Sequence, residues 1–312
     1  MSDKVAVHFR KTRTTAHLFQ RIKHCRKCGN YSCLWDDRCL SCGAERCWID
    51  VPEMVQAVQK HRAQTSMLFI GTIGAAAFLL ARNTKEMALA LIGTAVLLTL
   101  YALLSKQFKS IIYRRTLSRL VLHEMKKIRE GLLLDIGDAE KDFKAGDKKT
   151  AYEKFREIGY FINDDSIKLL KVYCLNHFVI RSDMNLELAS LLPGQFNKDF
   201  VRYMHEVGKV RPQLFTREVL DYVLKYCSAI EALPEGPHVL TAAAGAALRV
   251  KGYLRTYRQL LLERAVDLPK ERLLRLCRML AESQEYDAEL TATVRHVVKL
   301  KFASDPEFQG IL

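Results

Sequence analysis

One apolar stretch dominates the hydrophobic pattern of the chain, and it extends from Thr65 to Leu104. A charged turn at residues 82–86 (RNTKE) divides it into two arms, 65–81 and 87–104, and neither arm holds a charged residue. Each arm has about the length that a helix needs to cross a hydrocarbon core. A helix in a soluble protein normally keeps one polar face, so a hairpin buried in a soluble core is the less favoured interpretation. The pattern therefore predicts a transmembrane hairpin at 65–104, with the lipid bilayer as its partner.

Charged residues on either side of the hairpin indicate its orientation. Lys60 and Arg62 precede the first arm, and the second arm is followed by a basic group comprising Lys106, Lys109, Arg114 and Arg115. Because positive residues are enriched on the cytoplasmic side of a membrane, both termini are predicted to be cytoplasmic. Residues 1–24 contain no apolar core of signal-peptide length, which favours a bacterial plasma membrane over a eukaryotic internal membrane.

Helical periodicity governs the chain after the hairpin. Residues 105–134 predict a basic amphipathic stalk helix, because apolar residues recur every three or four positions at Leu117, Val121, Met125, Ile128 and Leu132. Three roles are open to it: packing on the C-terminal domain, lying on lipid headgroups, or forming a dimeric coiled coil. Breaks rich in Gly, Pro and Asp divide residues 135–312 into short helices, which predicts an all-α domain and favours an irregular helical solenoid over a compact bundle.

The N-terminal part is predicted to form only short elements of secondary structure. Residues 4–10 alternate apolar and polar side chains, which predicts a short strand that pairs with residues 18–22. Residues 51–64 predict a helix that connects to the membrane. The fold class is therefore mainly α, in five parts: a small β module at 1–50, the connecting helix at 51–64, the hairpin at 65–104, the stalk at 105–134 and the helical domain at 135–312.

The net charge of +14 suggests a nucleic-acid partner until it is divided along the chain. Residues 1–64 carry 12 Lys and Arg against 6 Asp and Glu, and residues 105–134 carry 8 against 2. The rest of the chain, from residue 135 onward, carries 27 against 26 and is nearly neutral. Basic residues beside a membrane are attracted to anionic headgroups, which explains this distribution without nucleic acid.

Two cysteine knuckles supply the strongest chemical signal. Cys25 and Cys28 precede Gly29, and the same CxxCG pattern recurs at Cys39 and Cys42 before Gly43. Four thiolates at this spacing suit one tetrahedral Zn²⁺ ion, and glycine permits the tight turn of each knuckle. A reducing compartment keeps such thiols available for metal. The four cysteines are therefore predicted to hold one structural zinc ion, coupled to the folding of a module too small to bury a sizeable core.

Residues 25–42 resemble a zinc ribbon in which two CxxCG knuckles are separated by the ten residues between Cys28 and Cys39. Cys33 and Cys47 extend the repeat, each standing five residues after the second cysteine of its knuckle. They are interpreted as core thiols, as extra ligands or as a redox-active pair. As extra ligands they would make the motif similar to the binuclear zinc cluster of fungal transcription regulators, which has six residues where this chain has four.

A second resemblance covers one segment of the helical domain. Over residues 137–163, Phe143, Gly146, Ala151 and Phe155 match positions of the tetratricopeptide repeat. The motif lacks the tryptophan and the closing proline of that family, and no second copy keeps its register. The resemblance implies a helical hairpin that binds protein partners.

No catalytic motif emerges: the chain has no phosphate-binding glycine loop, nucleophile elbow, HExxH or paired acidic loop motif. His177, His205 and His296 are interpreted as packed or surface histidines, and Cys174, Cys227 and Cys277 as core thiols.

The chain is therefore predicted to be a non-catalytic scaffold or adaptor that recruits protein partners through its helical domain. Gly71, Gly74 and Gly93 could let the arms of one hairpin, or the hairpins of two copies, pack closely. A membrane-tethered nucleic-acid binder and a regulatory subunit of a membrane complex are the alternatives.

Overall fold

The structure is a computed structural model that describes residues 4–282, 287–309 and 311. These residues are mainly helical, and they include one small three-stranded sheet near the N-terminus. This confirms the predicted class of a mainly α chain with a small β module. The chain forms two compact units, which we call the hairpin unit (Lys11–Gly146) and the helical unit (Asp147–Leu312 together with Met1–Arg10).

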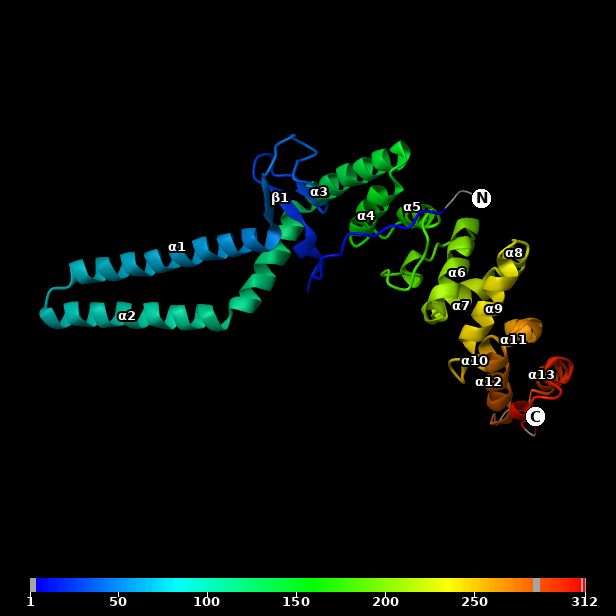
Figure 1. Cartoon of the computed structure of the whole chain (residues 1–312). Helices are drawn as coiled ribbons and strands as arrows, with labels where there is room; N and C mark the ends of the chain where they lie inside the picture. The colour runs from blue at the N-terminus through cyan, green and yellow to red at the C-terminus, as the bar shows by residue number, and fades with distance from the viewer. Residues whose placement is uncertain (1–3, 283–286, 310, 312) are drawn as a thin grey trace. The chain divides into compact units, whose positions relative to one another are not determined.

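Two long helices, α1 (Val51–Leu80) and α2 (Thr84–Gln107), lie side by side and form the hairpin (Figure 1). The connecting helix and the first apolar arm are thus one continuous helix. Both helices are long and apolar enough to cross a membrane, and the most apolar window of each has none of its residues buried within the protein. A hairpin in a soluble core would be covered by other residues, so its exposure argues against that alternative.

Gly74 brings the two helices of the hairpin into close contact. A Cβ atom added at Gly74 would lie 2.2 Å from Thr94 Oγ1, closer than real Cβ contacts allow. In contrast, a Cβ atom at Gly71 or Gly93 would meet nothing within 4 Å. Of the three glycines that suggested close packing, only Gly74 lies where the two helices of this hairpin contact each other.

Replacing Gly74 with leucine is expected to separate α1 from α2 and to destabilise the protein by about 1–3 kcal/mol, the usual cost of overpacking. Gly71→Leu is the matched control, because it makes the same change one turn away with open space around it. Thermal unfolding of the detergent-solubilised protein measures the difference. Equal shifts of the two midpoints would show that the contact at Gly74 has no energetic weight.

A third long helix, α3 (Lys109–Ala145), is continuous through the predicted boundary between stalk and helical domain. Within the hairpin unit it packs against α1 and against the small sheet. Leu117, Val121, Ile128 and Leu132 are buried on this face, as their spacing predicts, whereas Met125 is 49% exposed. None of the three roles considered for the stalk included this contact. The sheet and α1 both precede α3 in sequence, and they cover its apolar face because the chain folds back onto them after the hairpin.

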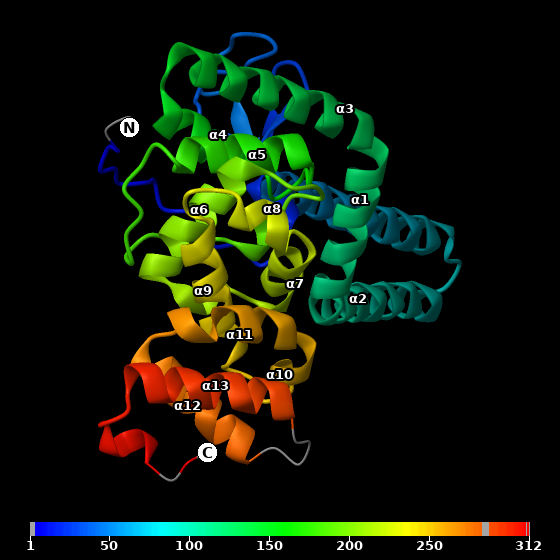
Figure 2. The ribbon, with the colours of Figure 1, turned by 90° about the vertical axis from the view of Figure 1, so that its right-hand side faces the viewer.

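The helical unit contains a succession of short helices, and its described residues include no strand. The helices are α4 (Lys148–Ile158), α5 (Asp165–Leu175), α6 (Lys198–Val210), α7 (Arg217–Lys225), α8 (Cys227–Glu231), α9 (Gly236–Ala247), α10 (Tyr253–Thr256), α11 (Arg258–Arg264), α12 (Lys270–Ala281) and α13 (Ala288–Lys301). In order of contact, α4 packs on α5, α5 on α6, α6 on α9, α9 on α11 and α11 on α13 (Figure 2). Contacts thus follow chain order, and the core is distributed along the unit.

Polar caps explain why these helices begin where the sequence breaks. The side chain of Asp147 accepts a hydrogen bond from the N–H of Thr150, and Asp164 does the same for Ser166. Before them, Gly146 ends α3 in the left-handed conformation, with a φ angle of 90°. Such caps satisfy the free N–H groups of a first helical turn.

The N-terminal segment differs from its prediction. Residues 18–21 form a 3₁₀ helix (Leu18–Arg21) and not a strand. Val5 instead forms an isolated parallel bridge with Phe178 of the helical unit, where its N–H donates to His177 O at 3.0 Å. The ring of Phe9 lies tilted against that of Tyr152, with 4.6 Å between ring centroids. The alternating pattern is therefore used to attach this segment to the helical unit.

Candidate metal centre

The scaffold of the site is the three-stranded antiparallel sheet, whose order is β2-β1-β3. Its strands are β1 (Lys23–Cys25), β2 (Tyr31–Ser32) and β3 (Trp48–Asp50). The first knuckle begins where β1 ends, so Cys25 is held by pairing with Trp48 on β3. The sheet thereby fixes one side of the site.

The two knuckle turns have the same conformation. Gly29 N–H donates to Cys25 O at 2.9 Å, and Gly43 N–H donates to Cys39 O at 2.8 Å. The φ angles of Gly29 and Gly43 are 74° and 70°. Side chains are strained in this left-handed region, so both turns require glycine, as the sequence pattern indicates.

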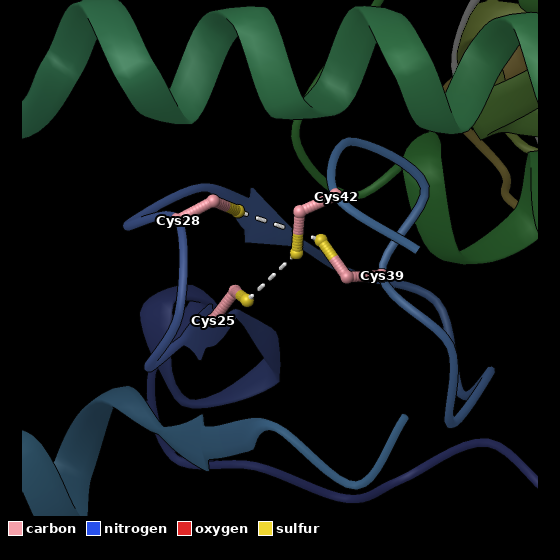
Figure 3. Close-up of side chains that lie close together, drawn as sticks. All are labelled: Cys25, Cys28, Cys39 and Cys42. Carbon is pink, nitrogen blue, oxygen red and sulfur yellow. Dashed lines mark hydrogen bonds between the residues drawn. The ribbon is translucent and has the colours of Figure 1, made fainter. Parts of the chain in front are cut away.

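The turns bring together all four predicted cysteines, whose sulfur atoms lie within 4.8 Å of one another (Figure 3). Cys25 Sγ lies 3.8 Å from Cys42 Sγ, and Cys28 Sγ lies 3.6 Å from Cys39 Sγ. In a tetrahedral zinc site with Zn–S bonds of about 2.3 Å, neighbouring sulfurs are about 3.8 Å apart. The cluster therefore lies within metal-binding distance and is consistent with a zinc ribbon.

The thiols of Cys25 and Cys28, both in the first knuckle, differ in pKa. Burial alone would raise the pKa of Cys25. Hydrogen bonds from the backbone N–H of Cys28 and from the thiol of Cys47 have the larger combined effect, and they lower this pKa to about 6. Burial, together with the neighbouring cysteines, raises the pKa of Cys28 to about 12. Cys28 therefore needs a nearby cation before it can be a thiolate at neutral pH, so metal binding would release its proton.

A fifth thiol borders the cluster. Cys47 Sγ lies 3.3 Å from Cys25 Sγ, and it donates a hydrogen bond to Ala44 O at 3.3 Å. Cys47 is half-buried, so it differs from an ordinary core thiol. Its position next to Cys25 is compatible with the interpretation of Cys47 as an extra metal ligand.

Cys33 faces helix α3. Its backbone N–H donates to Asp135 Oδ2 at 2.8 Å, and its thiol donates to the same oxygen at 3.3 Å. Ser32 Oγ donates to the other carboxylate oxygen of Asp135 at 2.8 Å. All three side chains are buried, so Asp135 is the polar centre of the contact between α3 and the sheet with its two knuckles (residues 23–50), which we call the ribbon.

Sequence reasoning missed this contact. The available signal was a single acid in the apolar segment GLLLDIG, residues 131–137, because a buried carboxylate in such a segment needs hydrogen-bond donors from another part of the chain. Gly131 lies one turn before Asp135 and lets the ribbon approach closely, since a Cβ atom there would lie 2.0 Å from Tyr31 O.

The ionisation of Asp135 should make the contact pH-dependent. Burial raises the pKa of Asp135 to about 6, although the donors from Cys33 and Ser32 act in the opposite direction. The folded state therefore binds this proton more tightly than the unfolded chain, whose aspartate pKa is about 3.9. The contribution of Asp135 to stability is therefore greatest below pH about 4, and roughly 3 kcal/mol of it is lost as the pH rises through about 6.

Asp135→Asn is expected to abolish this part of the pH dependence, because asparagine does not ionise. Urea unfolding of the solubilised protein between pH 4 and pH 8 measures it as a difference from wild type, which cancels the contribution of the metal site. Glu130→Gln is the control, because Glu130 is exposed on the same helix. A wild-type slope in Asp135→Asn would show that another group is responsible.

The remaining cysteines lie in the helical unit. Burial raises the pKa of Cys174 to about 12 and that of Cys277 to about 11, as expected for core thiols. Cys227 is only half-buried.

The fold and the site thus define a chain with a four-cysteine cluster, a small sheet, two apolar helices and a helical unit. No protein-family model, no curated protein and no solved structure matches the chain. The resemblance of residues 137–163 to a tetratricopeptide repeat therefore stays a prediction.

Proposed function

We propose that this protein is a membrane-anchored adaptor whose ribbon and helical unit both lie at the cytoplasmic face and whose helical unit recruits protein partners. The observation that carries the proposal is the uncovered apolar surface of α1 and α2. Only residues 81–83 separate these helices, so the chain has little to offer a ligand on the far side of a membrane. Recruitment by a tethered domain acts by raising the local concentration of its partner.

One structural Zn²⁺ ion, held by Cys25, Cys28, Cys39 and Cys42, belongs to this proposal. The sulfur spacing and the soft thiolate donors support zinc. The metal would stabilise the ribbon, which continues directly into α1 and contacts α3. The ribbon would then brace the two helices that leave the membrane.

The helical unit would act as a short irregular solenoid, which the chain-ordered contacts of its helices support. Its surface has a groove of about 490 Å³ between α6, α9 and α12. Small residues line part of it, including Gly208, Ala242 and Gly245. A groove lined in this way leaves room for an extended peptide.

The charge of this groove suggests the chemistry of the partner. The titratable residues that line it are all basic or imidazole side chains, namely His205, Lys209, His238, Arg249 and Arg272, and none of its described lining residues is acidic. Burial lowers the pKa of Arg249, and the nearby positive charges of Arg272 and Arg275 lower it further. Such crowding of positive charge favours an anionic occupant, and we assign the groove to an acidic segment of a protein partner.

Among the lining residues described there is no Phe, Tyr or Trp on which nucleic-acid bases could stack, which argues against single-stranded nucleic acid.

Binding of a fluorescent oligoglutamate peptide to the full-length solubilised protein tests this assignment. We expect binding that weakens with salt and that falls at least tenfold in the variant Lys209→Glu/Arg272→Glu. The matched control Arg295→Glu/Lys299→Glu makes the same charge change at exposed sites on α13 and should bind normally.

Affinity purification with the same variants tests the adaptor role itself. A stoichiometric protein partner that is lost only from the groove variant, and whose binding region is acidic, would support the proposal. Recovery of salt-sensitive nucleic acid and of no protein partner would overturn it in favour of a tethered nucleic-acid binder.

A further inference from the structure

A second cavity lies where α1, α2 and α3 meet, at the end of the hairpin opposite its turn. It has a volume of about 470 Å³ and is formed by residues 56–66 of α1, residues 101–105 of α2 and residues 109–116 of α3. We propose that this cavity binds the phosphate-bearing headgroup of an anionic phospholipid. The inference rests on the membrane anchoring of the proposed function and adds a specific ligand to it.

Positive charge is the first argument. Lys60, Arg62 and Lys109 line the cavity, and its described lining contains no acidic residue. Across residues 4–282, 287–309 and 311, none of these three side chains has an Asp or Glu partner within 4.0 Å. Three cations contributed by two helices therefore face one space without counter-charge, which is the chemistry that recognises a phosphodiester.

An unsatisfied donor is the second argument. Gln59 also lines the cavity, and its Nε2 atom is buried without a hydrogen-bond partner. Buried amide groups are nearly always paired, because loss of their hydrogen bonds to water is costly. A headgroup oxygen in the cavity would accept this hydrogen bond.

The position of the cavity along the hairpin selects a lipid over a soluble anion. Lys60, Arg62 and Lys109 lie just outside the two apolar arms, at the level where headgroups would lie. Ser66 and Tyr101, which also line the cavity, lie inside the arms. Tyrosine is typical of the membrane interface. The cavity thus extends from headgroup level to acyl-chain level, and only a ligand with both parts would use its full length.

Native mass spectrometry of the delipidated full-length protein tests the site. We expect one phosphatidylglycerol molecule to bind per chain, with at least tenfold preference over phosphatidylcholine. The variant Lys60→Gln/Arg62→Gln/Lys109→Gln should bind phosphatidylglycerol about a hundredfold more weakly. The control Lys106→Gln/Arg114→Gln/Arg115→Gln removes the same charge next to the same membrane surface but outside the cavity, and should bind as wild type does.

Two results would overturn the inference. Equal losses in both triple variants would show a diffuse attraction without a site, and displacement of phosphatidylglycerol by an equal concentration of glycerol 3-phosphate would show a site for a soluble anion. Extraction of membranes with alkaline carbonate separates this failure from failure of the anchor. Release of the wild-type protein by carbonate would overturn the membrane anchoring itself, whereas retention of the protein without lipid preference would overturn only the headgroup site.

Discussion

Removal of the metal is expected to unfold the ribbon while the helical unit stays folded. The three strands of the ribbon are two or three residues long, and a sheet of this size cannot bury enough apolar surface to be stable alone. Structural zinc contributes roughly 10–16 kcal/mol of apparent binding free energy at neutral pH, which is folding free energy for such a module. The contacts that Ser32 and Cys33 make with Asp135 on α3 would be lost together with the ribbon.

Tryptophan fluorescence can report this unfolding selectively. The chain has 2 tryptophans, Trp35 and Trp48, and both belong to the ribbon. A strong chelator, or the double variant Cys25→Ser/Cys39→Ser, should shift their emission to longer wavelength and reduce the zinc content to zero. Circular dichroism at 222 nm should fall only slightly, because most helices lie outside the ribbon.

Cys227→Ser is the matched control, because it removes a half-buried thiol of the helical unit. It should leave both the metal content and the tryptophan emission unchanged. A protein that loses its metal completely but keeps the emission of the folded ribbon would show that the four cysteines have no structural role.

Gly131→Ala should separate the ribbon from α3, at a cost of about 3 kcal/mol. The new methyl group would lie 2.0 Å from Tyr31 O and 2.8 Å from Tyr31 C, which are backbone atoms and cannot rotate away. The ribbon would have to move, and its hydrogen bonds to Asp135 would then break. Unfolding in urea, followed by tryptophan emission, measures the loss.

Gly137→Ala supplies an unusually close control. It is the same substitution on the same helix, but a Cβ atom there would meet nothing within 4 Å. Because alanine is the better helix former, this variant should be stabilised by up to about 1 kcal/mol. The prediction would fail if both variants were stabilised or if both were destabilised alike.

These results would connect the metal site to the hairpin. The ribbon continues into α1 at Val51, where Val51 N–H donates to Ile22 O at 3.2 Å, and it contacts α3 at Gly131 and Asp135. The two helices that leave the hairpin are therefore linked through this small module in addition to their direct contact with each other. Loss of zinc would remove the link through the ribbon and leave only the direct contact between α1 and α3.

The sequence by itself determined the features that depend on neighbouring residues. The knuckles at Cys25 and Cys39 were predictable because glycine at the fifth position of each motif imposes the turn that directs the sulfurs together. The two apolar arms were predictable because a long run without charge has few other structures. Helix starts such as Asp147 and Asp164 were predictable because a cap acts within three residues.

Only the tertiary structure decided the contacts between distant parts of the chain. The bond between Asp135 and Cys33 joins residues 102 apart in sequence, and the alternating pattern around Val5 does not reveal that its partner is Phe178. The groove around Arg249 and the cavity around Lys60 likewise collect charges from separate helices. The periodicity of a sequence predicts which face of a helix is apolar. It does not predict which residues cover that face, because this depends on how the whole chain packs.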